Sequence, residues 1–242
     1  MAKKKSMGNT PLGWAAVAGH EEVVKILLSR NDIDPDKPDE NGQTPLLQAV
    51  RNVHERMVKL LLGRDDIDPN ELDEDDLTSL LHAAENRHEA VAKILLGRDD
   101  VDPNKRDVFG TTPLLIVTWS GREGMLKLLL GRDDVDPNSP GVDGRTPLSY
   151  AAGSGREAVV KMLLGRDDVD PNTSDENGRT PLWWAAYRGH EGVVKLLLGR
   201  EGINAGKPDI CSRTPLWAAT KNGHSRIIAL LRPLTSATHS TA

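Results

Sequence analysis

The tripeptide Thr-Pro-Leu recurs along this 242-residue chain at one fixed spacing, which constrains the fold more than any other feature. It begins at Thr10, Thr44, Thr112, Thr146, Thr180 and Thr214, and Thr78-Ser79-Leu80 fills the one gap in the series. Seven copies therefore follow one another every 34 residues, without an insertion or a deletion. A period this strict predicts a solenoid, in which each repeat is one supersecondary unit that buries its apolar face against its neighbours.

Each repeat is expected to contain two short helices and a turn. Threonine is a good N-cap, and the proline that follows it fits the first helical position, where no backbone donor is needed. In the sixth repeat the spacing i, i+3, i+4, i+7 marks the buried stripe of a first helix at Leu182, Ala185, Ala186 and Gly189. A second, more apolar helix is predicted from Glu191 to Leu198. Asp-Pro-Asn and Asp175-Glu176-Asn177-Gly178 supply turn residues, so a hairpin-like loop should join successive repeats.

The segment from Gly178 to Leu198 reads Gly-x-Thr-Pro-Leu-x-x-Ala-Ala-x-x-Gly-His-x-x-Val-Val-x-x-Leu-Leu and resembles the ankyrin repeat. This resemblance extends over roughly residues 5 to 232 and is carried by seven copies. Two details resemble the fungal-type ankyrin arrays: the 34-residue period, and an aromatic residue two places after Thr-Pro-Leu at Trp14, Tyr150 and Trp184.

The resemblance implies an all-α ankyrin-repeat solenoid of seven helix-turn-helix units joined by hairpin-like loops. It also implies a concave surface, formed by the hairpin tips and the exposed face of the first helices, that binds other proteins. The family shares no catalytic residue and no cofactor. We expect one array over residues 1–234 and a disordered tail over residues 235–242, with Lys3 to Lys5, Arg226 and Arg232 keeping the terminal repeats soluble.

Composition and charge narrow the function classes. No run reaches the ~18 to 20 apolar residues of a membrane helix, and a net charge of −5 argues against a nucleic-acid partner. Cys211 is the one cysteine, which leaves no internal disulfide and no cysteine-based metal framework. We therefore expect a monomeric, intracellular protein of the cytoplasm, or of the nucleus if Lys3-Lys4-Lys5 assists import. No cofactor, metal, nucleic-acid or membrane partner is expected.

Framework positions carry much of the charge and most of the histidines. Lysines and arginines recur at fixed places, and acidic residues fill the loops between repeats, so we expect ladders of surface ion pairs. Five histidines follow the turn between the two helices: His20, His54, His88, His190 and His224. Because they lie in one row on different repeats, we expect them to hydrogen-bond to the neighbouring loop rather than to share a metal ion.

The aromatic residues divide into a framework group and a variable group. Trp14, Tyr150 and Trp184 occupy the family-typical position and are expected to pack between repeats. Phe109, Trp119, Trp183, Tyr187 and Trp217 occupy positions where other repeats carry something else. Phe109 falls at an expected hairpin tip, and Trp119 and Tyr187 fall on the outer part of a first helix, so we expect all three to meet a partner. For Trp183 and Trp217, recognition and inter-repeat packing remain equally open.

The third repeat departs most from the pattern, because Asp76 replaces the turn glycine and Ser79 replaces the helix proline. Its acidic tip combines with Glu85, and with apolar residues one repeat on, in an acidic and apolar patch that suits a basic, hydrophobic segment of a partner. Drift in one copy of a redundant array remains the alternative. The predicted partner-binding residues are Glu74, Asp75, Leu77, Glu85, Val108, Phe109, Trp119, Trp183, Tyr187, Arg188 and Trp217.

Two other functions remain open. The string Asp73-x-Asp75-Asp76 resembles the Asp-x-Asp-Asp motif of protonating terpene cyclases, which would make the chain a small-molecule binder or an enzyme using acid catalysis beside aromatic residues. A protonating carboxyl group must be desolvated, however, and a hairpin tip is wet. Near-identical loops also fit a designed or structural scaffold, although a bare scaffold would lack Trp119 and Asp76. We therefore predict a non-catalytic protein-interaction module with no catalytic residues.

Overall fold

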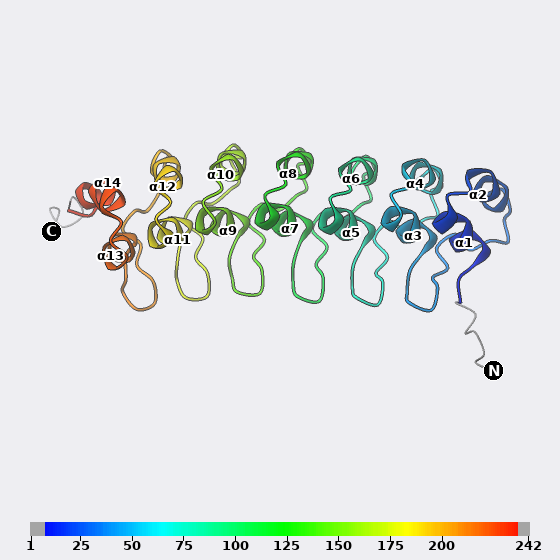
Figure 1. The fold of residues 1–242 in the computed structure, drawn as a ribbon, viewed down its shortest axis with the longest axis horizontal. Helices are drawn as coiled ribbons and strands as arrows, with labels where there is room; N and C mark the ends of the chain where they lie inside the picture. Colours follow the sequence, from blue (N-terminus) through cyan, green and yellow to red (C-terminus); the bar gives the residue numbers. More distant parts are fainter. Residues whose placement is uncertain (1–7, 237–242) are drawn as a thin grey trace. The chain divides into compact units, whose positions relative to one another are not determined.

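The computed structural model describes residues 8–236, in which fourteen helices form seven pairs and no strand occurs (Figure 1). The chain divides into two compact units, Met1–Pro113 and Leu114–Ala242. The first unit contains α1 (Pro11–Ala18), α2 (Glu21–Leu28), α3 (Pro45–Arg51), α4 (Glu55–Leu62), α5 (Ser79–Asn86) and α6 (Glu89–Leu95). The second contains α7 (Pro113–Ser120), α8 (Glu123–Leu130), α9 (Pro147–Gly153), α10 (Glu157–Leu164), α11 (Pro181–Arg188), α12 (Glu191–Leu198), α13 (Pro215–Lys221) and α14 (Ser225–Ser236). The predicted all-α array of helix pairs is confirmed.

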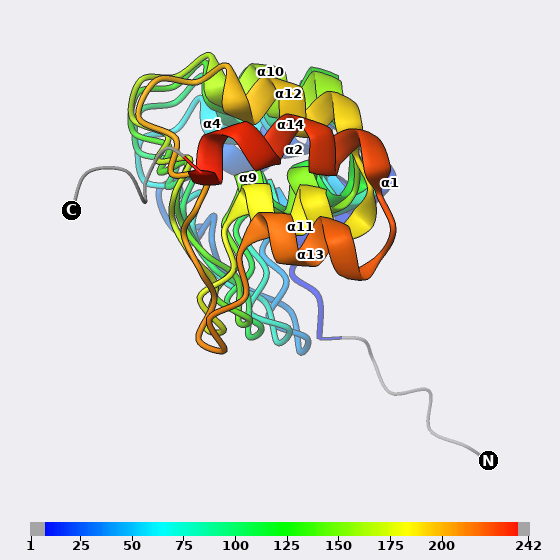
Figure 2. The same ribbon diagram turned by 90° about the vertical axis from the view of Figure 1, so that its left-hand side faces the viewer.

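Within each unit the helices form two layers. In the first unit α1 packs on α3 and α3 packs on α5, while α2 packs on α4 and α4 on α6. The second unit repeats this order, since α9 packs on α11 and α11 on α13. The long loops extend past the layer of first helices, as the end-on view in Figure 2 shows. First helices and loops of one unit therefore share a side of that unit.

The start of each first helix follows the predicted chemistry. The hydroxyl of Thr180 accepts a hydrogen bond from the backbone N–H of Trp183 at 3.1 Å, and Pro181 occupies the first turn. The same cap occurs at Thr10, Thr44, Thr78, Thr146 and Thr214. Thr78 caps α5 although Ser79 replaces the proline, because the cap needs only the hydroxyl. The predicted helix from Glu191 to Leu198 has those bounds in the structure.

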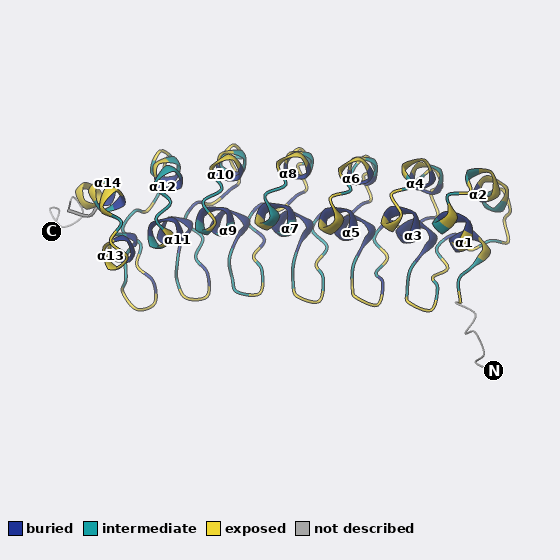
Figure 3. Cartoon of the chain, in the orientation of Figure 1, coloured by how far each residue is buried: buried dark blue, intermediate teal, exposed yellow. Residues whose placement is uncertain are grey.

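Aliphatic and small side chains make up most of the buried residues of both units. Figure 3 shows that the buried residues are concentrated on the first helices. The leucine of the tripeptide is buried in six repeats: Leu12, Leu46, Leu80, Leu114, Leu148 and Leu182. Val and Leu of the second helices, such as Val58 and Leu61, are fully buried as well. Because each repeat is a thin layer, these side chains fill most repeats without aromatic bulk. The sixth repeat is the exception, since it buries Trp183 and Trp184.

The loops that follow the second helices tie neighbouring repeats together. Arg166 donates to Asp168 and also to the main-chain carbonyls of Leu130 and Arg132 in the preceding repeat, at 3.4 and 2.8 Å. Arg98 makes the equivalent bonds in the first unit. The predicted ion-pair ladder is therefore confirmed, and its arginines also cross-link repeats through main-chain acceptors that the sequence did not reveal.

His54, His190 and His224 hydrogen-bond to the preceding repeat, as predicted, but their acceptors lie in the last turn of its first helix and not in a loop. Nε2 of His54 lies 3.0 Å from the carbonyl oxygen of Val17, and His190 and His224 contact the carbonyls of Gly153 and Tyr187 at 3.1 Å. These hydrogen bonds join three of the turns to the preceding repeat, whereas Nδ1 of His88 is buried without a hydrogen-bond partner.

Some expectations stay untested by the fold. Of the expected tail over residues 235–242, α14 includes the first two residues, and residues 237–242 lie outside the described part, as do Lys3 to Lys5. The single array over residues 1–234 stays a prediction, since the two units are described separately. Among residues 8–236, no helix combines the length and apolar character needed to cross a membrane.

Candidate functional site

A buried aspartate organises several of the hairpin tips, at Asp73, Asp175 and Asp209. In the third repeat, Oδ1 of Asp73 accepts hydrogen bonds from the backbone N–H groups of Asp75 and Leu77 at 3.1 and 2.9 Å. Its other oxygen lies 2.8 Å from Nε2 of His82, and both side chains are buried. Asp73 therefore holds the tip in shape, and a carboxylate occupied in this way is poorly placed to give a proton to a substrate.

The acidic residues of this tip are exposed around that buried pair. Glu74, Asp75 and Asp76 face solvent, and Asp76 adopts the left-handed conformation, φ 56°, that glycine takes in most other tips. Asp and Asn tolerate this conformation better than other side chains do. The tip therefore keeps its fold without glycine and gains a carboxylate.

Three predicted binding residues line one open hollow in the first unit. It has a volume of about 430 Å³ and is bounded by Arg51, Asp75, Leu77, His82, Glu85 and Asn86. Asp75, Leu77 and Glu85 are thereby brought together, with Glu85 contributed by α5. Of the residues around the hollow none is Phe, Tyr or Trp, the rings that stabilise a cation best. Within the described residues no three His, Cys, Asp or Glu side chains are grouped to hold a metal ion.

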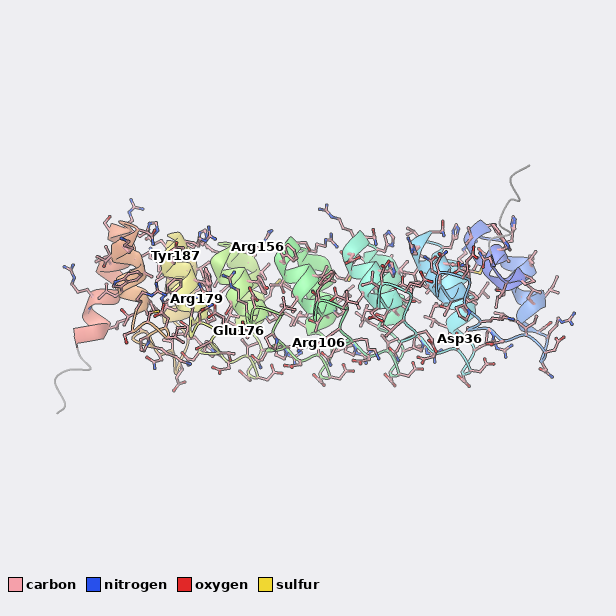
Figure 4. All side chains as sticks on the ribbon, turned by 90° about the horizontal axis from the view of Figure 1, so that it is seen from below. Asp36, Arg106, Arg156, Glu176, Arg179 and Tyr187 are labelled. Atoms are coloured by element: carbon pink, nitrogen blue, oxygen red, sulfur yellow. The ribbon has the colours of Figure 1, made fainter. Side chains whose placement is uncertain are left out.

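The next tip of the first unit exposes apolar side chains. Phe109 is 69% exposed and Val108 is also exposed, while the backbone N–H of Phe109 donates to Oδ1 of Asp107 at 2.9 Å. Arg106, labelled in Figure 4, donates to the carbonyl of Gly110 at 3.3 Å. The first unit carries 15 Lys and Arg against 22 Asp and Glu, a net charge of −7. An exposed phenyl ring thus belongs to a strongly acidic unit.

In the second unit the predicted aromatic residues separate by burial. Trp119, on α7, is 67% exposed, whereas Trp183 is only 4% exposed. Trp217 holds the equivalent position one repeat after Trp183 and is 40% exposed. Trp183 is buried because its ring stacks on Tyr187 at 5.0 Å and its Nε1 donates to the carbonyl of Arg213 at 3.1 Å. Packing explains Trp183, while Trp119 and Trp217 keep surface that a partner could cover.

Two guanidinium groups lie against the ring of Trp184. The guanidinium carbon of Arg145 is 3.4 Å from the centroid of the Trp184 ring, and that of Arg179 is 4.2 Å away. Such contacts are worth about 0.5–2 kcal/mol each, more where water is excluded. Figure 4 shows Arg179 ahead of the start of α11 and Tyr187 toward its other end. Trp184 is buried, so its predicted packing role is confirmed, whereas Trp14 at the equivalent position of the first repeat is exposed.

Asp175 completes this cluster as its buried anion. Oδ1 accepts from the backbone N–H groups of Asn177 and Arg179, and Oδ2 accepts from Nε of Arg179 and Nε1 of Trp184, all at 2.9 to 3.0 Å. Arg145 adds a longer ion pair at 3.9 Å. Burial lowers the pKa of Arg145 in spite of its acidic neighbours. Asp143, whose Oδ2 lies 3.3 Å from Nε of Arg145, is the second carboxylate, so two anions balance two guanidinium groups. This balance indicates a structural rather than a catalytic cluster.

Arg213 repeats part of this arrangement beside Trp217. Its guanidinium lies 5.2 Å from the Trp217 ring and its Nε donates to Asp209 at 2.8 Å. Arg188 is exposed and lies 5.9 Å from the ring of Tyr187, which is half-buried. The second unit has 16 Lys and Arg against 14 Asp and Glu, a net charge of +2. The two units therefore carry opposite charge.

Sequence reasoning missed the arginine row at Arg145, Arg179 and Arg213. The signal was present, because each arginine directly precedes the Thr-Pro-Leu tripeptide in three successive repeats, where the first four repeats carry Asn, Gln, Leu and Thr. An aspartate stands four residues before two of them, at Asp175 and Asp209. Their closeness to the tryptophan rings depended on how the loop folds back over the first helix.

Comparison with known proteins gives one family. The family model for ankyrin repeats, built of three copies, matches residues 1–73, 32–107, 80–175 and 167–239. No curated protein sequence matches the chain.

Three solved structures illustrate the similarity. The ankyrin repeat domain of Bcl-3, described as a unique member of the IkappaB protein family, has a TM-score of 0.83 and 27% identity, covering 94% of this chain and 100% of that one. The ankyrin repeat protein EF0377 has a TM-score of 0.72 and 28% identity, covering 77% and 96%. An ankyrin repeat domain from Acinetobacter baumannii AYE has a TM-score of 0.71 and 27% identity, covering 78% and 96%.

Proposed function

The chain belongs to the ankyrin-repeat family, and from that premise we propose that it is a non-catalytic module that binds a protein partner. The fold is typical of protein-interaction modules. The binding surface comprises hairpin tips and the exposed ends of first helices, and the partner contacts side chains that the repeat does not dictate. The single cysteine suits a reducing compartment, so the proposal is of an intracellular protein, acting as a monomer.

The observation that carries the proposal is the exposure of large rings at variable positions. Phe109 is exposed at a tip where the other repeats with this loop have Asn, Asp or Cys. Trp119 is exposed at a position held by Val, Arg, Glu, Gly, Tyr or Lys elsewhere. The repeat fold needs neither ring, and burying an exposed ring against a partner contributes favourably to the free energy of binding.

Charge indicates the kind of partner for the first unit. Asp75 and Glu85 are exposed and line one hollow with Leu77, in a unit of net charge −7 that also exposes Glu74 and Phe109. A basic segment that also carries apolar side chains complements this acidic tip surface in both respects. Complementary charge mainly raises the association rate and makes binding sensitive to salt.

Selection of peptides from a random library tests the proposal, because the library contains basic, acidic and apolar sequences alike. We expect selected peptides to combine Lys or Arg with aromatic or aliphatic residues, and their affinity to fall as salt rises. The D75N/E85Q variant should weaken binding on the order of ten-fold, because it removes two charges while preserving side-chain size. Glu89→Gln is the matched control, since Glu89 is exposed on the second-helix layer. Peptides without basic residues, or equal weakening by E89Q, would contradict the proposal.

A further inference from the structure

At several junctions between repeats, an asparagine in one loop makes two hydrogen bonds to the main chain of the next loop, an arrangement that we call a clasp. In each case Oδ1 accepts from a backbone N–H 32 residues further on, and Nδ2 donates to a backbone carbonyl 30 residues further on. Asn70 bonds to the N–H of Asp102 and the carbonyl of Asp100, both at 2.7 Å. Asn138 bonds to the N–H of Asp170 at 2.9 Å and the carbonyl of Asp168 at 2.6 Å. Asn172 bonds to the N–H of Asn204 at 2.7 Å and the carbonyl of Gly202 at 2.9 Å. Donor and acceptor of one amide thus bridge two repeats.

The first repeat has an aspartate at this position. Asp36 lies in the loop between α2 and α3 and is labelled in Figure 4. Its Oδ2 accepts from the backbone N–H of Asp68, 32 residues further on, at 2.7 Å, which reproduces the first bond of the clasp. Its Oδ1 is buried and has no hydrogen-bond partner. This oxygen takes the place of the amide nitrogen that donates in the asparagine clasps. The residue 30 further on is Asp66, whose main-chain carbonyl also accepts, so the ionised carboxylate offers it no donor.

The surroundings favour the neutral form of Asp36. Burial is the largest cause that raises its pKa, to about 6, and the neighbouring charges of Asp68, Glu71 and Asp34 add to it, against the hydrogen bond from the Asp68 N–H. The charge of Asp36 helps to raise the pKa of Arg98, but the guanidinium of Arg98 is bonded to Asp100 and not to Asp36. The protonated carboxyl group has one donor and one acceptor, as the amide has.

We propose that Asp36 is a proton-operated latch between the first and second repeats: its protonated Oδ1 donates to the main-chain carbonyl of Asp66 and completes the clasp that asparagine makes at other junctions. The ionised form holds the junction by one bond only. Because the pKa in the folded chain lies above that of an unfolded aspartate, the latch stabilises the junction fully below about pH 4. That stabilisation is lost as the pH rises through about 6.

Two substitutions with opposite expected results test the latch. Asp36→Asn should supply the donor at every pH, and Asn138→Asp should install a second proton-dependent junction in the other unit. The change from 3.8 to about 6 limits the effect of ionisation to about 100-fold on local opening, and the half-exposed position of Asp36 reduces this to the order of ten-fold. Amide hydrogen exchange in α1 to α4, expressed as protection factors, reports local opening.

At pH 7, D36N should raise protection in these helices about ten-fold, and at pH 4 it should change protection less than two-fold. Carboxyl carbon NMR should show Asp36 titrating near pH 6, and N138D should lower protection in α8 to α10 at pH 7 but not at pH 4. Titration of Asp36 near pH 4, or an equal effect of D36N at both pH values, would overturn the proposal. So would an N138D variant whose protection does not depend on pH.

Discussion

Replacing Asp175 by alanine is predicted to destabilise the second unit strongly. The substitution removes the acceptor of four hydrogen bonds and leaves the guanidinium of Arg179 and the indole N–H of Trp184 without their shared anion. Removing one partner of a buried, hydrogen-bonded ion pair costs about 3–5 kcal/mol. We expect a loss in that range for D175A. Trp184→Phe, which loses one of the four bonds and keeps most of the ring, should cost about 1 kcal/mol.

Asp209 supplies a matched comparison one repeat later. It accepts from the backbone N–H groups of Cys211 and Arg213 and from Nε of Arg213, but no indole bonds to it. Arg213 is also more exposed than Arg179, so D209A should cost about 2 kcal/mol. Urea unfolding followed by tryptophan fluorescence is the assay, because four of the five tryptophans lie in the second unit. A loss below 1 kcal/mol for D175A, or a larger loss for D209A, would refute this reasoning.

Three further perturbations test particular positions. Val53 holds the left-handed conformation at φ 58°, which is costly for a β-branched residue, so V53G should stabilise the first unit by about 1 kcal/mol in urea unfolding. At the equivalent Gly223, nothing lies within 4 Å of an added Cβ, so G223V should destabilise the second unit by a similar amount through backbone strain. Asp76→Gly should raise stability by about 0.5–1 kcal/mol and weaken peptide binding, whereas drift in the third repeat predicts unchanged binding. Burial and a hydrogen bond to Asp143 raise the pKa of Tyr150 to about 12. The neutral phenol therefore stabilises the fold up to pH 10, and this contribution is lost as the pH rises through about 12. In the Y187F variant, where Tyr150 is the one tyrosine, phenolate absorbance should show a single titration near pH 12, and a midpoint near pH 10 would contradict the prediction.

The helices could be predicted from the sequence because their signals are local. A threonine, followed by proline in every repeat but the third, marks the start of each first helix, and the 34-residue period extends one assignment to all repeats. The position of the histidine row and the ion-pair ladder follow from the same period.

The fate of individual aromatic residues could not be predicted in this way. Trp183 and Trp217 occupy equivalent positions, yet one is buried and the other is exposed, because burial depends on the stacked ring of Tyr187 and on the Arg213 carbonyl of the following repeat. The arginines around Trp184 were also missed, since their contacts arise from the folded loop. Variation between repeats acts through neighbours in space, which periodicity does not specify.

Calorimetry with a selected basic peptide tests most directly whether the variable rings form the binding surface. The F109A/W119A variant should lose at least ten-fold in affinity while its far-UV circular dichroism stays unchanged, because both side chains are exposed and neither supports the core. Ile26→Ala is the matched control, since Ile26 is 66% exposed on the second-helix layer and its removal should leave affinity unchanged. Unchanged affinity of the double variant, or an equal loss with I26A, would contradict the proposed surface.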